Sequence, residues 1–301
     1  MRVVIALGGN ALLKRDQSLD YEVQRQNVRL AARSIAEVAR SHAVIVTHGN
    51  GPQVGLLALQ AAAYVAVPPY PLDVLGAESE GMIGYIIEQE LMAALPGRPV
   101  ATLLTQVEVD PNDPAFASPT KPIGPVYDEA TADRLRREKA WPFCRDGAGF
   151  RRVVASPIPR RILEVNALRL LVEAGVLVVC AGGGGIPVTI DAAGAVRGME
   201  AVIDKDRSAA LLAVELGADA LLLLTDVDAV YADWLGAKVD AIRSTTPATM
   251  RRMAFDAGSM GPKVEAACGF VEATDRMAGI GALGDAAKIL RGASGTIVRN
   301  A

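Results

Sequence analysis

Three glycine-rich stretches have a composition typical of anion-binding loops. Each comes directly after a short aliphatic run. They read LGGNAL, THGNGP and AGGGGIP. Glycines let the backbone approach a ligand closely, successive N–H groups in such turns bind anions, and a helix start that follows adds a favourable dipole. One glycine turn is equally well explained by the steric needs of a β-to-α connection, but three together favour anion binding. The residues concerned are Gly8, Gly9, Asn10, Gly49, Asn50, Gly51, Gly183 and Gly184.

Lysines at unusual positions supply the positive charge that such a site needs. In AVIDKDRSAA, Asp204 is a candidate N-cap, so Lys205 falls in the first turn of a helix, where its charge opposes the helix dipole. Phosphate binding is one reason for that placement, with Asp206 holding the ammonium group; a solvated Lys205 paired with Asp204 is the alternative. Lys263 follows GSMGP, whose proline is expected at the first position of another helix. Lys121 lies between prolines in SPTKPIGP, where an ordinary exposed loop lysine is the alternative.

The segment LLLLTDVDAVY presents two carboxylates at the end of a strand. Asp226 and Asp228 follow Thr225, and Tyr231 comes shortly after. Carboxylates there suit three roles: holding a ribose, orienting a lysine, or sharing a Mg²⁺ ion through water. An Asx-turn that caps the next segment is an equally good interpretation.

Composition excludes several other classes of site. No stretch matches G-x-x-x-x-G-K-S/T or G-x-G-x-x-G, so neither a P-loop nor a Rossmann dinucleotide site is indicated. Three widely spaced cysteines and two histidines indicate neither a disulfide framework nor a zinc or histidine-rich metal site. The net charge of −3 gives no reason to expect nucleic acid or a membrane surface as partner. With no signal-peptide pattern and no apolar stretch long enough to span a bilayer, a cytoplasmic protein is expected.

Short apolar runs alternate with helical patterns along the chain, which predicts an α/β fold around a mostly parallel sheet. In such sheets ligands bind beyond the carboxyl ends of the strands, where the glycine stretches and Asp226 fall. The segments 3–7, 43–47, 99–107, 152–155, 176–181, 221–225, 278–280 and 296–298 are expected as strands, and 21–40, 78–95, 162–174, 205–216 and 262–274 as helices. Residues 110–149 interrupt this alternation of strands and helices. They include six prolines and one helical pattern, 128–139, and they have little strand character. We interpret them as a small ordered lid.

The motifs together resemble the carbamate kinase branch of the amino acid kinase family. The stretches that carry the likeness, in order along nearly the whole chain, are IALGGNALL, THGNGPQVG, PTKPIGPVY, RRVVASPIP, AGGGGIPV, AVIDKD, LLTDVDAVY and GSMGPKV. Related acetylglutamate kinases carry a lysine two residues before the first Gly-Gly, where this chain has Ala6. The resemblance implies that Lys121, brought by the lid, supplies that charge, which favours carbamate as the acceptor over a larger acid.

The resemblance also implies an architecture. It is an open αβα sandwich with two lobes, 1–195 and 196–301, and a protruding subdomain at about 110–150. The first lobe binds carbamate or carbamoyl phosphate on the Gly8–Asn10 and Gly49–Gly51 loops, the second binds ADP or ATP with Mg²⁺, and family members are homodimers. The resemblance assigns catalysis to Lys121, Lys205, Asp206 and Lys263, and nucleotide binding to Gly183, Gly184, Thr225, Asp226, Val227, Asp228, Tyr231, Met260 and Lys263.

Two alternatives and one departure remain open. The chain could be a kinase for another small acid or phosphate, or an inactive nucleotide- or oxyanion-binding protein on the same fold. Retention of the three lysines and Asp206 argues against inactivity. Glu78 and Glu80 depart from residues common in the family, and because they lie outside the phosphate loops we expect them to affect dimer contacts or tuning rather than chemistry. The direction of flux and the pathway that supplies the substrate also stay open.

Overall fold

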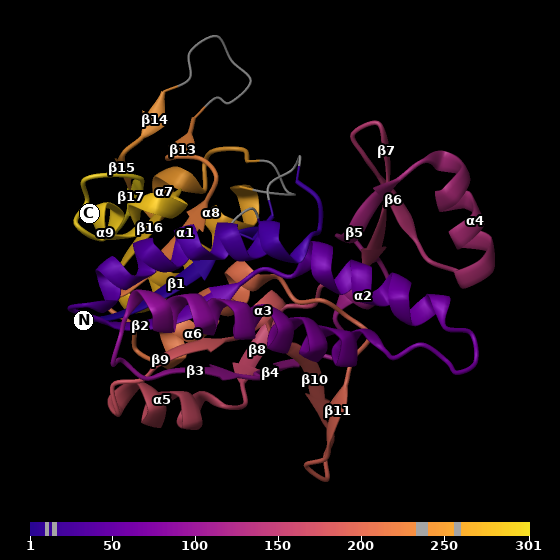
Figure 1. Ribbon diagram of the computed structural model, residues 1–301. Coiled ribbons are helices and arrows are strands. Elements are labelled where there is room, and N and C mark those ends of the chain that lie inside the picture. Colours follow the sequence, from indigo (N-terminus) through magenta and orange to yellow (C-terminus); the bar gives the residue numbers. More distant parts are fainter. Residues whose placement is uncertain (10–11, 14–16, 233–239, 256–259) are drawn as a thin grey trace.

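A computed structural model describes residues 1–9, 12–13, 17–232, 240–255 and 260–301, which fold around one central sheet (Figure 1). Its strand order is β15-β17-β16-β12-β1-β2-β9-β3, and only the β16–β17 pair is antiparallel. The predicted mostly parallel α/β architecture is therefore confirmed. The strands are β1 (Arg2–Leu7), β2 (Ala43–His48), β3 (Val100–Leu103), β9 (Leu177–Cys180), β12 (Ala220–Thr225), β15 (Ser244–Thr245), β16 (Met277–Ala282) and β17 (Thr296–Val298).

Helices cover both faces of the sheet because its strands are apolar on both sides. In β1, Val4 and Ala6 belong to one buried cluster, together with residues of α5 (Val165–Glu173), α6 (Lys205–Glu215) and α8 (Met260–Thr274). Val3, Ile5 and Leu7 alternate with them and belong to a second cluster. That cluster includes residues of α1 (Tyr21–Ala39), α3 (Leu72–Ala94) and α9 (Ala286–Leu290). The period-two alternation of side chains along β1 thus produces the two helical layers.

The lid is a small subdomain with its own sheet, which stands apart from the central layers in Figure 1. Its three strands, in the order β5-β7-β6, are β5 (Lys121–Tyr127), β7 (Gly149–Val154) and β6 (Phe143–Asp146), and helix α4 (Glu129–Lys139) packs beside them. The Arg152 guanidinium lies 3.9 Å from the centre of the Trp141 ring, and that of Arg136 lies 5.3 Å from the Phe143 centre. These cation–π contacts help to order a subdomain that has a small apolar core.

The expectation that 110–149 has little strand character is wrong. Prolines normally argue against a strand because they cannot donate to the ladder. Here β5 lies at the edge of its sheet, and its register against β7 shifts between Ile123 and Tyr127, which places Pro125 within the irregular part. The expected strand at 152–155 likewise belongs to the lid, as β7, and not to the central sheet.

Two other boundaries differ from expectation. The apolar run 99–107 forms two strands: β3 stays in the central sheet, while β4 (Gln106–Val109) joins a second sheet of order β11-β10-β4-β8. The helix expected from residue 78 begins at Leu72, where Leu72 and Leu75 extend its buried stripe. Pro262 is not the first residue of its helix, since α8 already includes Met260.

The remaining elements complete the chain. They are α2 (Gly51–Ala63), α7 (Pro247–Met250), β8 (Pro159–Ile162), β10 (Ile186–Ile190), β11 (Val196–Gly198), β13 (Val230–Tyr231), β14 (Ala241–Ile242), and the 3₁₀ turns Pro114–Phe116, Gly182–Gly184 and Leu283–Asp285. The proposed lobe boundary at 195 falls in the connection between β10 and β11, which pair as an antiparallel hairpin. Among the described residues, no helix has the length and apolarity needed to cross a bilayer.

Candidate active site

Four neighbouring strands end at the same edge of the central sheet, and the glycine stretches follow three of them. Because β12, β1, β2 and β9 are parallel neighbours, their carboxyl ends lie side by side. A Cβ atom placed on Gly49 would lie 3.3 Å from Gly9 Cα, and one on Gly183 would lie 2.1 Å from Asn50 Nδ2. The three loops therefore pack directly on one another, and their predicted convergence is confirmed. Asn10, predicted to bind substrate, lies outside the described residues.

Most of the glycine N–H groups already have partners inside the protein. Gly8 N donates to Leu224 O at 2.8 Å, and Gly49 N donates to Leu7 O at 3.2 Å. In the third loop, Gly182 N, Gly184 N and Gly185 N donate to other protein oxygens. These N–H groups are thus engaged within the protein, while the assignment of the loops to an anion stays a prediction. The glycines instead allow close backbone packing, as at Gly8, where a Cβ atom would lie 2.9 Å from Leu224 O.

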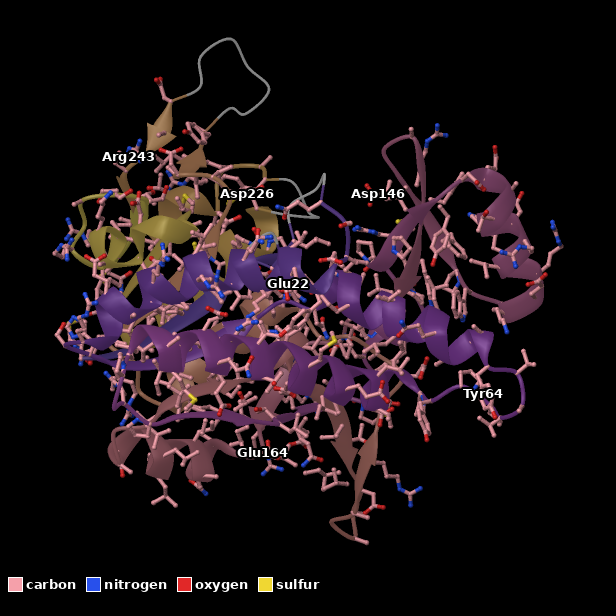
Figure 2. The ribbon with its side chains drawn as sticks, in the orientation of Figure 1. Glu22, Tyr64, Asp146, Glu164, Asp226 and Arg243 are labelled. Carbon is pink, nitrogen blue, oxygen red and sulfur yellow. The ribbon has the colours of Figure 1, made fainter. Side chains whose placement is uncertain are left out.

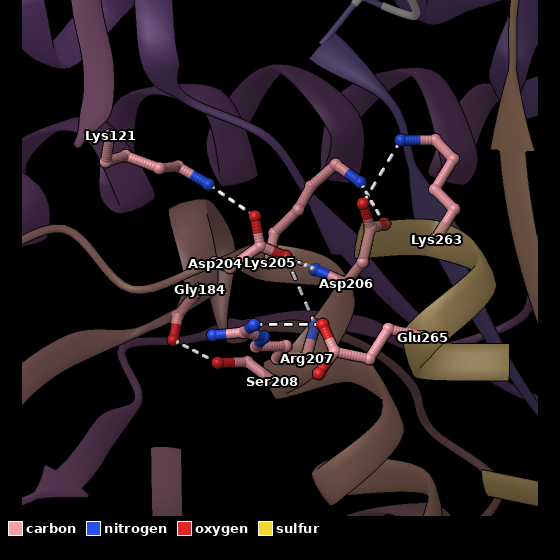
Figure 3. Close-up of polar contacts among 9 residues, drawn as sticks. All are labelled: Lys121, Gly184, Asp204, Lys205, Asp206, Arg207, Ser208, Lys263 and Glu265. Atoms are coloured by element: carbon pink, nitrogen blue, oxygen red, sulfur yellow. Dashed lines mark hydrogen bonds and ion pairs between the residues drawn. The ribbon is translucent and has the colours of Figure 1, made fainter. Parts of the chain in front are cut away.

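Two buried lysines share one aspartate beside these loops (Figure 3). Lys205 binds Asp206 Oδ1, and Lys263 Nζ lies 3.1 Å from Asp206 Oδ2. All three side chains are nearly buried, and a Cβ atom on Gly49 would lie 3.5 Å from Lys205 Cδ. The solvated alternative for Lys205 is therefore excluded, and its partner is Asp206 rather than Asp204.

Asp204 connects the lid to this cluster. Its Oδ1 accepts hydrogen bonds from Asp206 N at 3.0 Å and Arg207 N at 3.3 Å, which confirms it as the N-cap of α6. Its Oδ2 accepts from Lys121 Nζ at 2.5 Å. Lys121 lies on β5, at the edge of the lid sheet, so this bond joins the lid to the start of α6.

The cluster carries an excess of positive charge. Three ammonium groups, those of Lys121, Lys205 and Lys263, face two carboxylates, which leaves a net charge of +1. Burial lowers the pKa of Lys205 because it disfavours the charged form, and Asp206 opposes this shift. Burial acts to raise the pKa of Asp206, but the two lysines outweigh it and hold that pKa below its ordinary value. An anion that enters here meets uncompensated positive charge in a site largely shielded from water.

The lid approaches the body at a second point through two glycines. A Cβ atom on Gly55, in α2, would lie 1.9 Å from Gly124 Cα, in β5. Gly124 has φ of +73°, a left-handed conformation that side chains rarely adopt. Backbone contact between α2 and the lid strand therefore sets where Lys121 lies, and only glycine at both positions permits it.

The predicted nucleotide residues follow β12 on the same edge of the sheet. Thr225 Oγ1 donates to Asp226 Oδ1 at 3.0 Å. The Asp228 carboxylate accepts from Tyr231 OH at 2.5 Å and from Arg243 at 3.0 Å, so it orients a tyrosine and an arginine rather than a lysine. Figure 2 shows Asp226 and Arg243 on the body of the molecule, away from Asp146 on the lid.

The other predicted nucleotide residues lie on both sides of the loops. Val227 is half-buried after β12, and Met260 begins the described part of α8 and packs against the core. Gly183 and Gly184 lie instead beside Asn50 and Ile203, and Gly184 O accepts from Ser208 Oγ at 2.7 Å. Their assignment to the nucleotide stays a prediction.

Sequence reasoning missed Ser79 and Thr105, and it assigned Glu80 to dimer contacts or tuning, whereas Glu80 is fully buried in its own chain and bonds the third loop. Glu80 and Ser79, on α3, contact the third and second loops, and Thr105 accepts from Ala181 N at 3.0 Å. A signal for Glu80 was present, because it shares a helical stripe with Ile83, which is fully buried. His48 is also buried, which lowers its pKa to about 4 and keeps the ring neutral.

Comparison with known proteins identifies the family. The family model described as "Amino acid kinase family" matches residues 1–278. The carbamate kinase of Rhizobium meliloti is 57% identical over 99% of this chain and 93% of its own length. This chain belongs to the amino acid kinase family, among the carbamate kinases.

Solved structures of this family agree with the assignment. A carbamate kinase from Giardia lamblia bound to citric acid superimposes with a TM-score of 0.93 at 39% identity and covers 99% of this chain and 98% of its own. The same protein bound to AMP-PNP gives a TM-score of 0.90 at 40% identity with the same coverage. The chain is thus a phosphotransferase of the amino acid kinase family.

Proposed function

We propose that this enzyme transfers a phosphoryl group reversibly between ATP and carbamate, and that formation of ATP and carbamate from ADP and carbamoyl phosphate is favoured. The observation that carries the proposal is the cluster in which Lys121, Lys205 and Lys263 surround two aspartates with a net charge of +1, beside the converged glycine loops. The relative from Giardia lamblia that binds AMP-PNP supports an adenine nucleotide as one substrate.

The substrates occupy opposite sides of this cluster in the proposal. Carbamate or carbamoyl phosphate binds at the Gly8–Asn10 and Gly49–Gly51 loops of the lobe 1–195. ATP or ADP binds in the lobe 196–301, at Thr225–Tyr231 and the start of α8, with Gly183 and Gly184 between the two. The transferring phosphoryl group then lies within reach of the ammonium groups.

Phosphoryl transfer depends mainly on positioning and on neutralising charge. Lys205 and Lys263 neutralise charge along the phosphate chain, Asp206 holds both ammonium groups, and Lys121 approaches from the lid. Carbamate already carries an anionic oxygen, so no general base has to remove a proton. An acyl phosphate donates its phosphoryl group more readily than ATP, which sets the favoured direction. An equilibrium that lies towards carbamoyl phosphate would contradict this part of the proposal.

Mg²⁺ enters the reaction as part of the nucleotide substrate in this proposal. Within the described part of the chain, no group of three or more His, Cys, Asp or Glu side chains could hold a metal ion. Asp204 and Asp206 are each engaged by lysines. The ion is therefore expected to be held by the phosphate oxygens and water rather than by a dedicated protein cage.

The deciding experiment measures ATP formed from ADP, Mg²⁺ and carbamoyl phosphate. Wild-type enzyme should exceed the rate of spontaneous carbamoyl phosphate decay by a wide margin. Lys205→Met, which fills the same space without the charge, should lose this activity, while Lys139→Ala, at an exposed lysine, should keep it. Nucleotide binding by calorimetry without ATP formation would favour a kinase for another small acid, to be found by acceptor screening. Loss of both binding and activity would favour an inactive protein on this fold.

We propose further that the enzyme is a cytoplasmic homodimer. The apolar stripe of α3 packs largely inside its own chain through Ile83 and Ile87, but Met82, Tyr85 and Met92 of the same helix are exposed. A two-fold contact along this face would cover them. Light scattering at micromolar concentration should give twice the 31.5 kDa chain mass, and a monomer would refute the proposal.

A further inference from the structure

We propose that Ser79 and Glu80 are positioning residues that lock the second and third glycine loops together and so shape the anion site; this inference rests on the function proposed above. The two residues are neighbours on α3, and both are fully buried. Neither carries the chemistry itself. Each instead bonds a loop that does not belong to its own helix.

Glu80 joins the third loop to the point where the chain leaves the central sheet. Its Oε1 accepts from Gly182 N at 2.8 Å, and its Oε2 accepts from Thr105 N at 3.2 Å. Thr105 lies between β3 and β4, and its hydroxyl accepts from Ala181 N at 3.0 Å. The carboxyl group thus joins two backbone segments that both cross from the central sheet to the second sheet, one between β3 and β4 and the other between β9 and β10.

Ser79 joins the second loop to the same helix. Asn50 Nδ2 donates to Ser79 Oγ at 2.8 Å, and Ser79 Oγ donates to Gly76 O at 2.8 Å. Asn50 also lies so close to Gly183 that a Cβ atom there would be 2.1 Å from its amide nitrogen. Holding the Asn50 side chain therefore also limits where Gly183 can lie.

The third loop needs such support because its backbone is unusual. Ala181, a residue with a side chain, has φ of +48°, and Gly183 and Gly184 have φ of +67° and +99°. Non-glycine residues in the left-handed region persist only when the surroundings enforce them. The hydrogen bonds from Ala181 N and Gly182 N to Thr105 and Glu80 provide that enforcement.

The test compares three variants by enzyme kinetics. Glu80→Met fills the buried space but accepts no hydrogen bond, and Ser79→Ala releases Asn50 while leaving Glu80 in place. Both should raise the KM for carbamoyl phosphate, by about ten- to a hundredfold for Glu80→Met, because two hydrogen bonds of ordinary strength are lost together. In Glu80→Met the KM for ADP should also rise, because the loop that Glu80 holds contains Gly183 and Gly184, which are assigned to the nucleotide. In Ser79→Ala the KM for ADP should stay within about twofold, because the hydrogen bond that is lost belongs to the second loop. Glu37→Met, on the exposed side of α1, should leave both constants unchanged.

Hydrogen exchange supplies a readout that does not depend on activity. Amides of 181–186 should exchange faster in Glu80→Met, and those of 49–51 faster in Ser79→Ala, with no change in Glu37→Met. An unchanged KM for carbamoyl phosphate in both variants, or unchanged exchange in these segments, would overturn the proposal. If wild-type enzyme makes no ATP, the proposed function fails, and the exchange comparison alone decides whether Ser79 and Glu80 position the loops. If Glu80→Met does not fold, Ser79→Ala decides by the same two measurements.

Discussion

Asp204 should contribute to turnover through Lys121 alone. Asp204→Asn keeps an oxygen for the α6 N-cap but removes the charge that holds the Lys121 ammonium at 2.5 Å. The pair is mostly shielded, with 27% of the Lys121 side chain and 14% of the Asp204 side chain exposed. A hydrogen bond between charged groups contributes about 1.5–3 kcal/mol, which corresponds to roughly ten- to a hundredfold in kcat.

A double-mutant cycle with Lys121→Met tests this reasoning in the assay of ATP formation from carbamoyl phosphate. Lys121→Met alone should lower kcat strongly with little effect on unfolding by urea, since Lys121 lies on the edge strand of the lid. In that background Asp204→Asn should have no further effect on kcat, because the two residues act as one unit. Asp285→Asn, which removes a carboxylate paired with the exposed Lys288 at 2.9 Å, is the matched control and should leave kcat unchanged.

Two results would refute the mechanism. If the effects of Asp204→Asn and Lys121→Met on the activation free energy simply add, Asp204 acts on something other than Lys121. If Asp204→Asn alone turns over like wild type, the bond seen here does not set the position of Lys121 during the reaction.

Two further predictions concern the lid and the pH dependence of stability. Gly55→Ala should reduce kcat severely, because its Cβ atom would lie 1.9 Å from Gly124 Cα and force the lid strand away. Gly269→Ala, at a helical site with open space, should keep kcat and raise the free energy of unfolding by up to about 1 kcal/mol. Equal kcat values in the two variants would contradict this account. Burial raises the pKa of Glu80 from 4.5 to about 8, so between these pH values the native state retains a proton that the unfolded chain releases. The free energy of unfolding should therefore fall as the pH rises through this range, by roughly 3–5 kcal/mol in total. Urea unfolding from pH 5 to 8 should therefore show a smaller decline in Glu80→Gln than in wild type, and identical pH profiles would remove Glu80 as the cause.

The sequence predicts most of the central sheet because its strands are short apolar runs whose burial is local information. The strand 43–47 and the helix 21–40 match β2 and α1 to within one residue. The run 99–107 was predicted as one strand because no proline or glycine after Pro99 interrupts it, although the chain changes sheets near Thr105. That change is decided by partners far away in sequence, β9 for one half and β10 for the other. The periodicity of apolar residues does not indicate which strand a given strand pairs with.

The candidate site shows the same limit for charged groups. Lys205, Lys263 and Asp206 could be found because each has an unusual local position, at or near a helix start. The bond between Lys121 and Asp204 spans 83 residues, and the one between Glu80 and Gly182 spans 102. Neither residue type nor spacing indicates such pairings before the fold brings them together. Glu80 did have a local signal, because its charge falls on the buried stripe of α3, but the sequence does not indicate its partner.

The arrangement of charge explains why stability and function compete in this site. Lys205 and Lys263 lie in the first turns of α6 and α8, where each opposes a helix dipole, and each charge disfavours the other. Asp206 satisfies both ammonium groups but carries one negative charge for their two positive charges, and Asp204 is occupied by Lys121. In the absence of a ligand the protein therefore maintains a buried region with excess positive charge, which lowers its stability. In the proposed reaction a phosphoryl group between the lysines would supply the missing negative charge, and relief of the unfavourable electrostatics of the empty site would then contribute to its binding free energy.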